Sequence, residues 1–400
     1  MLSPTIALLI SIALIILLVR IRAHPGLAIF VGAVVMSVMV VPLDSIPSLM
    51  WSSIWSLQTL KLMIIVASAL TLSGVMEQEG LMAKLAGEME SVGPRVALHF
   101  IPAAIGLVPM PAGALVSATA SRGLVERLGL TPEQGTFINY WFRHIWEFSL
   151  PIYPTVVITG AILSVSFLSL LKVLFPATVL VTVLGAVMSY WVLRKVTTTG
   201  GKLTKSVVGN LFRAAWPILV LVPAVLLGLD AAIAFPLVVG ALALQRRLKW
   251  TSLKSPLKYG LNVKILLLLY AIMFYKAVIQ GSDTTEAIIS GMQTAGLPAL
   301  FLLIAPPFLI GLAMGLGMAF AGVVMPLLMP YLMSGGSVDG PALLLAYVSG
   351  MMGVLLSPVH LCLILSADYF KANLAEVYVY ILPLFVAIEG IAAGIYCLAA

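Results

Sequence analysis

The stretch NYWFRHIWEFSLPIYP (139–154) places an arginine, a histidine and a glutamate within five residues and follows them with Pro151 and Pro154. The segment around it is otherwise apolar enough to cross a membrane. Proline interrupts the hydrogen bonds of a helix and lipid offers no replacement partners, so such a break persists only where it is buried or lines a polar cavity. The stretch therefore predicts a membrane helix that is broken at a functional site.

The polar residues of this stretch lie on one face of the predicted helix. Thr131, followed by Pro at the first helical position and Gln at the third, predicts the N-cap of the helix. At a rise of 1.5 Å per residue, Arg143 lies roughly 15 Å along it, near the membrane midplane. Asn139, Arg143 and Glu147 are spaced i, i+4 and i+8, so their shared face leads into the break at Pro151.

Two kinds of role remain open for the ionisable residues. Arg143 and Glu147 form a structural salt bridge, or Arg143 is a two-donor ligand for an oxyanion while Glu147 tunes it or carries a coupling proton. His144 is either a structural histidine or a proton carrier. His360, which follows a second break in LSPVH (356–360), is a further candidate for the site.

The composition indicates the class of protein. With 62% hydrophobic and 9% charged residues among 400, the chain has too little polar surface for a water-soluble globule and is predicted to be a polytopic membrane protein. Its apolar runs are helix-length and lack period-2 alternation, which favours an all-α fold over a membrane barrel. No basic run with interleaved aromatics predicts nucleic-acid binding. Cys362 and Cys397 lie in apolar runs and are interpreted as buried hydrophobes, neither disulfide-bonded nor metal-binding.

The predicted fold has about ten transmembrane helices and two re-entrant hairpins. The hairpins correspond to two long apolar stretches interrupted by Pro and Gly, 96–121 and 297–333, each entering and leaving on one side of the membrane. Two helices, 133–166 and 342–369, are predicted to be broken at mid-membrane. The remaining spans are expected at 4–20, 26–43, 61–77, 168–193, 213–229, 231–245, 264–280 and 373–398.

The basic residues predict the orientation. The first apolar run has no basic segment before it and no cleavage site after it, so it is predicted to be a retained span with its N-terminus outside. Of the 22 basic residues, Arg143 then lies within the membrane, and Lys61, Lys172 and Lys276 lie on the outer side. The inner side holds all the others. The positive-inside rule thus predicts a multi-pass protein of the cytoplasmic (inner) membrane with both termini outside, and this orientation explains the net charge of +7.

The basic segment 194–212 divides the chain into two halves with the same order of parts. Each half has three spans, an amphipathic arm (80–90 or 285–295), a hairpin, a broken helix and a closing span. Five crossings are an odd number, so the second half is predicted to be inverted relative to the first, as in many secondary transporters. The alternative is a chance recurrence of Pro and Gly. The predicted division is scaffold at 1–93 and 194–295 (which includes the linker), and transport domain at 94–193 and 296–400.

The tips and breaks carry a family resemblance. The order of parts, with a hairpin and a broken helix in each half, resembles the ion transporter superfamily, which includes gluconate permeases, citrate carriers and sodium–dicarboxylate symporters. The stretches NYWFRHIWEFSLPIYP, PMPAGALVSA (109–118) and GMMGVLLSPVHLCL (350–363) are more similar still to an uncharacterised integral-membrane family usually placed within it. The resemblance covers essentially the whole chain and implies a homodimer formed through the scaffold. The tips PMPAG (109–113) and GMAFAG (317–322) lack the Ser-Asn-Thr signatures of the sodium–dicarboxylate symporters, so neither sodium coupling nor dicarboxylate specificity carries over.

The predicted site lies at the hairpin tips and the breaks. Small residues let the backbone approach a ligand, and half-helix N-termini direct positive dipole ends toward an anion. For 317–322 the alternative is small-residue helix packing. The substrate-binding candidates are Pro109, Pro111, Ala112, Gly113, Asn139, Arg143, Ser149, Ala321, Gly322, Ser357 and His360, and the candidates for ion or proton coupling are Glu147 and His144.

The leading hypothesis is a secondary active transporter of a small organic anion of the carboxylate type, working by elevator-like alternating access and coupled to H⁺ or Na⁺. The alternative is a cation/proton antiporter of the same fold, since Glu147, His144 and His360 are titratable. An intramembrane enzyme is the alternative from a different class, although the sequence has no HExxH, GxSxG, GxGD or Walker A motif. The expected partners are the anion and membrane lipid, and no cofactor or metal is expected beyond the coupling ion.

Overall fold

The structure is a computed structural model that describes residues 3–110, 113–194, 196, 204–281, 296 and 298–399. These residues are mostly helical. The helices among them that are long and apolar enough to cross a membrane are Leu57–Gln78, Phe167–Leu193, Lys205–Leu226, Trp250–Gln280, Gly340–Phe370 and Leu374–Ala399. The chain is therefore a multi-pass, largely helical membrane protein.

Most helices begin and end close to the predicted spans. They are α1 (Pro4–Arg20), α2 (Pro25–Val40), α4 (Leu57–Gln78), α10 (Phe167–Leu193), α12 (Ala231–Gln245), α14 (Val263–Gln280) and α20 (Leu374–Ala399). Several start at a side chain that accepts a backbone N–H of the first turn, such as Ser56 before α4 and Asn262 before α14. The helix α11 (Lys205–Leu226) begins earlier than the predicted 213, because Thr204 caps it.

Two segments expected to be plain connectors contain helices. The helix α3 (Ile46–Trp55) lies within 44–61, and α13 (Trp250–Gly260) lies within 246–263. They are 10 and 11 residues long, too short to cross a membrane, so neither was predicted as a span. The first amphipathic arm is α5 (Leu81–Glu90), whereas the second arm at 285–295 lies outside the described residues.

Each predicted hairpin contains a pair of packed helices. The first pair is α6 (Pro94–Gly106) with α7 (Gly113–Arg127), and the second is α16 (Ala299–Met314) with α17 (Gly317–Leu332). The second turn lies at Gly315 and Leu316, so the tip predicted at 317–322 is instead the start of α17. The reason is that Gly315 has a φ of +59° and ends α16 in the left-handed conformation that glycine tolerates. A two-stranded antiparallel sheet, β1 (Met333–Ser334) and β2 (Ser337–Val338), follows α17.

Both helices predicted to be broken are interrupted at the expected prolines. The first consists of α8 (Pro132–His144), the 3₁₀ turn η2 (Ile145–Phe148) and α9 (Pro154–Leu163), and the second of α18 (Gly340–Leu356) and α19 (Leu361–Phe370). Thr131 caps α8 as predicted, and its side chain and that of Gln134 form a reciprocal capping box. Every residue of α18 from Ala342 to Leu356 is buried, so this helix lies at the centre of the core.

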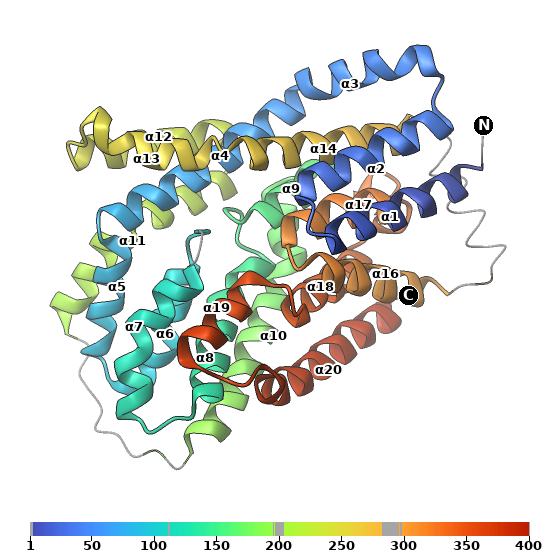
Figure 1. Ribbon diagram of the computed structural model, residues 1–400. Coiled ribbons are helices and arrows are strands. Elements are labelled where there is room, and N and C mark those ends of the chain that lie inside the picture. Colours follow the sequence, from blue (N-terminus) through green and yellow to red (C-terminus); the bar gives the residue numbers. More distant parts are fainter. Residues whose placement is uncertain are drawn as a thin grey trace.

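The two halves of the chain interlock through these parts. The second helix of each hairpin packs against the half-helix that follows the break of the other half, α7 against α19 and α17 against α9. Within each half, the first hairpin helix packs against the helix that precedes the break, α6 against α8 and α16 against α18. Figure 1 shows α4, α12, α13 and α14 running along one side of the molecule, with α6, α7, α8 and α19 on the other.

Candidate functional site

Hydrogen bonds to α18 hold the first break in place. The helix α8 gives way to the single 3₁₀ turn η2, and regular helix resumes only where Pro154 begins α9. The hydroxyl of Tyr347 in α18 donates to the carbonyl of Glu147 (2.8 Å). In the opposite direction, the hydroxyl of Tyr140 in α8 donates to the carbonyl of Leu355 (2.8 Å). These bonds tie the interrupted backbone of one half to the central helix of the other.

Arg143 lies in the last turn of α8 and is only 3% exposed. Its contacts are long: Nη1 is 3.6 Å from Oε1 of Glu147 and 3.4 Å from Nε2 of His144, and Nη2 is 3.4 Å from the carbonyl oxygen of Met110. Its Nε has no hydrogen-bond partner in the described part of the chain. Charge-assisted N–H···O bonds are about 2.7–2.9 Å long, so this buried guanidinium has donor capacity that the described residues do not use.

Two glycines of the first hairpin make room for Arg143. A Cβ at Gly113 would lie 2.5 Å from Nη2 of Arg143, and a Cβ at Gly106 would lie 2.2 Å from the Arg143 carbonyl oxygen. The hydroxyl of Tyr153, just before α9, donates to the carbonyl of Gly106. The first hairpin therefore reaches the first break on both sides of the turn that joins α6 to α7.

The second hairpin meets the second break at His360. Nδ1 of His360 is 2.8 Å from the carbonyl oxygen of Gly315, and the hydroxyl of Ser357 donates to the carbonyl of Leu312 (2.7 Å). A Cβ at Gly315 would lie 2.9 Å from the Ser357 hydroxyl, so glycine is required here by space as well as by backbone conformation. Each hairpin turn thus contacts the break that follows it in the sequence.

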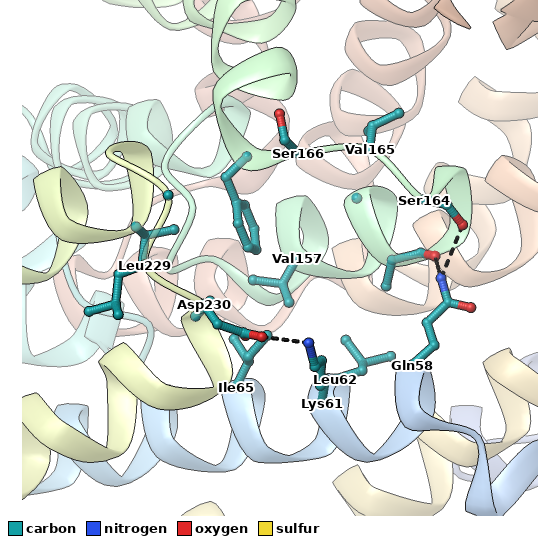
Figure 2. Close-up of a pocket in the computed structure, with 16 residues that line it drawn as sticks. Gln58, Lys61, Leu62, Ile65, Val157, Ser164, Val165, Ser166, Leu229 and Asp230 are labelled. Atoms are coloured by element: carbon teal, nitrogen blue, oxygen red, sulfur yellow. Dashed lines mark hydrogen bonds and ion pairs between the residues drawn. The ribbon is translucent and has the colours of Figure 1, made fainter. Parts of the chain in front are cut away.

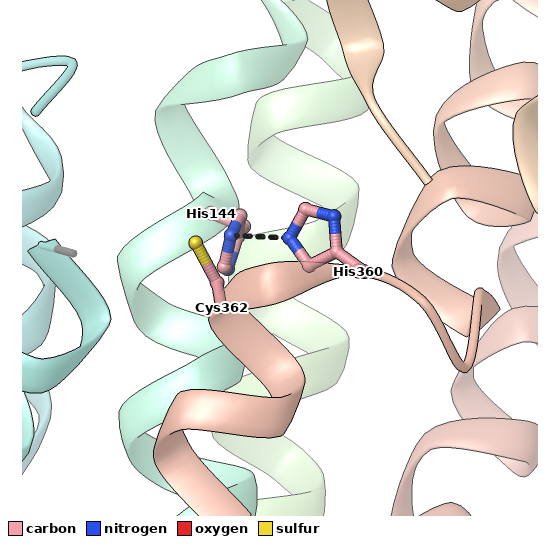
Figure 3. A group of neighbouring side chains, drawn as sticks. All are labelled: His144, His360 and Cys362. Carbon is pink, nitrogen blue, oxygen red and sulfur yellow. Dashed lines mark hydrogen bonds between the residues drawn. The ribbon is translucent and has the colours of Figure 1, made fainter. Parts of the chain in front are cut away.

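The two breaks meet at a pair of histidines. Nε2 of His144 and Nε2 of His360 are 3.2 Å apart, and Nδ1 of His144 is 2.6 Å from the carbonyl oxygen of Tyr140. Figure 3 shows Cys362 at the start of α19 beside this pair, with the ligand atoms of the two histidines and the cysteine all within 4.8 Å of one another. Oε1 of Glu147 is 3.8 Å from Nε2 of His144. The cluster therefore combines side chains from both halves of the chain.

The predicted residues Asn139 and Ser149 contact neighbouring helices. The side-chain amide of Asn139 donates to the carbonyl of Ala114 in α7 (3.0 Å) and to the hydroxyl of Ser366 in α19 (2.9 Å). The Ser149 hydroxyl is 2.7 Å from that of Thr178 in α10. Asn139 therefore fixes α8 against the two helices that cross at the interface between the halves.

The predicted residues of 317–322 lie away from the Arg143 cluster. A Cβ at Gly322 would lie 2.3 Å from Cγ1 of Ile272 in α14, and Ala321 is fully buried in α17. This placement matches the alternative of small-residue packing between helices. Among the residues of the first tip, Pro109 is buried beside Met110, and Gly113 contacts Arg143. Pro111 and Ala112 lie outside the described residues.

Sequence reasoning missed the position of Cys362. The cysteine is partly exposed and belongs to the histidine cluster, in contrast to its interpretation as a simple buried hydrophobe. The available signal was its spacing two residues after His360, at the start of a half-helix. Its proximity to His144 depends on the packing of α19 against α8, which no local pattern specifies.

Lys276, counted with the outer basic residues near the end of the predicted span 264–280, is in α14 and only 5% exposed. Its Nζ donates to Oε1 of Gln58 (3.0 Å) and to the carbonyl of Ala161 (3.2 Å), near the C-terminus of α9. A cation is favourable there because the last carbonyls of a helix are unpaired and carry partial negative charge. The short half-helix α9 explains why a buried lysine is tolerated.

A pocket of about 480 Å³ opens next to this contact, where the end of α9 meets α4 and the start of α12 (Figure 2). Lys61 and Asp230 form a 2.5 Å ion pair at its wall, and the hydrogen bond from Lys61 lowers the pKa of Asp230. Gln58 donates to the hydroxyl of Ser164 across it (3.2 Å). Neither Arg143 nor the histidines line this pocket, so it is a separate feature.

The fold is similar to that of a solved transporter. The YdaH transporter of Alcanivorax borkumensis aligns with a TM-score of 0.64 and 16% sequence identity, over 88% of this chain and 89% of that chain. At this identity the likeness concerns the fold alone. A search of the curated proteins found no match to the sequence. The family described as "Protein of unknown function (DUF401)" matches residues 2–398, and the chain belongs to that family.

Proposed function

We propose that the chain is a secondary active transporter of a small organic anion that binds at Arg143. The observation that carries this proposal is the buried guanidinium, whose contacts are 3.4–3.6 Å long and whose Nε has no partner in the described part of the chain. A carboxylate accepts two parallel N–H bonds from a guanidinium, so an anion would supply the acceptors that the protein does not. Burial makes such a bond stronger than it would be in water.

The helix starts at the hairpin turns and the breaks support the same ligand class. Four helices begin at the tips and breaks, namely α7, α9, α17 and α19. Their N-terminal N–H groups carry partial positive charge, which favours an anion. A Cβ at Gly317, the first residue of α17, would lie 2.4 Å from the hydroxyl oxygen of Thr155 in α9, so two of these helix starts are in direct contact.

The proposed mechanism is elevator-like alternating access between two inverted repeats. In it, residues 94–193 and 296–400 form the transport domain that moves against a scaffold of residues 1–93 and 194–295. The reciprocal packing of α7 on α19 and of α17 on α9 supports this arrangement, because two inverted repeats would make equivalent contacts with each other. The fold of the YdaH transporter is consistent with a transport function.

We also propose a location, an oligomeric state and a coupling ion. The protein is placed in the cytoplasmic membrane as a homodimer, with both termini outside. The coupling ion is H⁺ or Na⁺, and Glu147 and His144 are the candidates for coupling because their acceptor atoms lie 3.8 Å apart beside Arg143. Substrate and ion would then bind within one cluster, so that the movement of one depends on the other.

A second candidate function is cation/proton antiport. It is favoured by the acceptor atoms that converge in the cluster, two histidine Nε2 atoms and a Glu147 carboxylate oxygen. Under this alternative Arg143 serves as a fixed counter-charge for Glu147. The two functions differ in whether an organic anion crosses the membrane.

The test begins with a thermal-shift screen of the purified full chain against organic acids, with sodium concentration and pH varied. Acids that raise the melting temperature are then tested for uptake into proteoliposomes under imposed proton or sodium gradients. The proposal predicts uptake of at least one organic anion driven by one of the gradients. Cation-dependent pH changes in the proteoliposomes without any anion uptake would contradict it and support the antiporter.

A further inference from the structure

The hydrogen bonds of His144 and His360 fix the protonation of one nitrogen in each ring. Nδ1 of His144 is 2.6 Å from the Tyr140 carbonyl oxygen, and Nδ1 of His360 is 2.8 Å from the Gly315 carbonyl oxygen. A carbonyl oxygen accepts hydrogen bonds and cannot donate, so each Nδ1 must carry the proton. In a neutral imidazole the other nitrogen, Nε2, then has a free lone pair.

The two Nε2 atoms lie close together. The Nε2 atoms are 3.2 Å apart, a hydrogen-bond distance between two groups that are both acceptors. Nη1 of Arg143 lies 3.4 Å from Nε2 of His144, but it is at the long limit for a hydrogen bond. A cation between the two nitrogens would satisfy both lone pairs at once.

His99 in α6 is a histidine whose two ring nitrogens both have hydrogen-bond partners in the protein. Its Nδ1 is 2.6 Å from the carbonyl oxygen of Arg95, four residues earlier, as Nδ1 of His144 is from Tyr140. Its Nε2, however, is 2.5 Å from the hydroxyl of Ser189, which is able to donate a proton. His99 thus needs no cation, whereas His144 faces a second acceptor.

Cys362 adds a third candidate metal ligand to the histidine pair. The Cys362 thiol lies within 4.8 Å of both histidine ligand atoms, and the Glu147 carboxylate is 3.8 Å from Nε2 of His144. Two nitrogens and one sulfur suit zinc, which is often bound by three protein ligands with the fourth position left open. Two nitrogens bound at about 2.0 Å in a tetrahedral site lie about 3.3 Å apart, close to the separation of the Nε2 atoms.

The surroundings of the ligands also suit a metal. Histidines that bind a metal usually donate their second ring N–H to a backbone carbonyl or a carboxylate, and both histidines here do so. A thiolate and a carboxylate would balance the two charges of the ion, which leaves Arg143 as the net positive charge of the cluster.

We propose that His144, His360 and Cys362 bind a zinc-class divalent ion, with the Glu147 carboxylate nearby and the fourth position open. The ion joins α8 of the first half to the start of α19 of the second, at the point where the two breaks meet. This inference goes beyond the proposed transport of an anion and does not depend on it, because it rests on the ligand geometry alone. A metal-bound His144 has no free nitrogen for a coupling proton, so with the ion in place Glu147 is the coupling candidate.

Cobalt titration of the purified, metal-free full chain tests the proposal. Co²⁺ occupies zinc sites and reports a thiolate ligand through a charge-transfer band and tetrahedral geometry through visible bands. We expect one Co²⁺ per chain with both features, displaced by Zn²⁺. The Cys362→Ser variant should lose the charge-transfer band, whereas Cys397→Ser, which removes the other cysteine of the chain, should keep it. Absence of the band in the unmodified chain, or its survival in Cys362→Ser, would overturn the proposal.

A second measurement keeps the result independent of folding defects. Zn²⁺ binding to the native state should raise the melting temperature of the unmodified chain and of Cys397→Ser. The rise should be absent or much smaller in Cys362→Ser, while the melting temperatures of the three metal-free proteins should agree. The His99→Asn variant should retain the zinc effect, and equal zinc shifts in Cys362→Ser and the unmodified chain would contradict the assignment. Neither measurement involves transport, so failure here leaves the anion proposal untouched.

Discussion

Arg143 and Glu147 lie one helical turn apart, yet Nη1 and Oε1 are separated by 3.6 Å, too far for a direct hydrogen bond of ordinary length. The exposed pair Arg122 and Glu126 has the same spacing in sequence, and its Nε and Oε1 are 2.8 Å apart. Regular helix ends between Arg143 and Glu147, and the Arg143 guanidinium also reaches the carbonyl of Met110 in the first hairpin. A salt bridge with Glu147 therefore does not satisfy Arg143.

The space at Gly113 is expected to control the position of Arg143. A Cβ there would lie 2.5 Å from Nη2, so Gly113→Ala should displace the guanidinium, the flexible end of its side chain, with little effect on the backbone. We expect anion affinity to fall by about 1–3 kcal/mol, the range for a lost hydrogen bond to a charged group. Binding of the anion found in the thermal-shift screen measures this.

The control for this variant lies on the same helix. A Cβ at Gly123 meets nothing within 4 Å, so Gly123→Ala should leave affinity unchanged. Equal affinities of the Gly113→Ala and Gly123→Ala proteins would show that the Gly113 contact does not position Arg143 for binding.

The close packing of α16 on α18 is expected to be sensitive to a single methyl group. A Cβ at Gly353 would lie 2.2 Å from the carbonyl oxygen of Phe308, and backbone atoms cannot move away as a side chain can. Gly353→Ala should therefore destabilise the protein by about 1–3 kcal/mol. The melting temperature in detergent checks this against Gly390→Ala in α20, whose Cβ meets nothing within 4 Å. A Gly353→Ala protein as stable as the Gly390→Ala control would refute the packing argument.

The proposed orientation predicts which loops are reachable from outside the cell. In a chain whose two cysteines are replaced by serine, Lys205→Cys should react with a membrane-impermeant maleimide only after the membrane is opened. Leu227→Cys, at the other end of α11 and 89% exposed, should react in intact cells. The opposite pattern would reverse the orientation, and labelling of both sites in intact cells would exclude α11 as a membrane span.

The ion pair between Lys61 and Asp230 gives a pH dependence of defined sign. Its hydrogen bond lowers the pKa of Asp230, so the pair stabilises the native state above the ordinary aspartate value of about 4. This contribution is lost as the pH falls through the lowered native-state value. Both side chains are more than a third exposed, so a double-mutant cycle of Lys61→Met and Asp230→Asn should give on the order of 0–1 kcal/mol at neutral pH. The coupling should vanish in acid, and a coupling that persists there would contradict the assignment.

The sequence predicts the helix starts near the site better than it predicts contacts between residues far apart in the chain. Thr131 and Pro154 mark helix starts through their own chemistry, and the structure places helix boundaries at both. The second hairpin tip was predicted at 317–322, but α16 ends at Gly315. Gly315 and Gly317 are both suited to end a helix, and the sequence alone does not show which of them does. The contact of Cys362 with His144 depends on how α19 packs against α8, and a single sequence carries no record of that distance.

The central claim is that Arg143 binds the transported anion, and Arg143→Lys tests it most directly. Lysine keeps the charge but loses the planar two-donor fork, so anion affinity should fall by about 1–3 kcal/mol, which is on the order of tenfold or more. The melting temperature without substrate should change little, and Arg122→Lys, at an exposed arginine of α7, should leave affinity unchanged. Glu147→Gln separates the binding role of Arg143 from its pairing with Glu147. Anion affinity and melting temperature are measured together for these variants. The account predicts that Arg143→Lys binds the anion more weakly and keeps a normal melting temperature, and unchanged anion affinity in Arg143→Lys would contradict it.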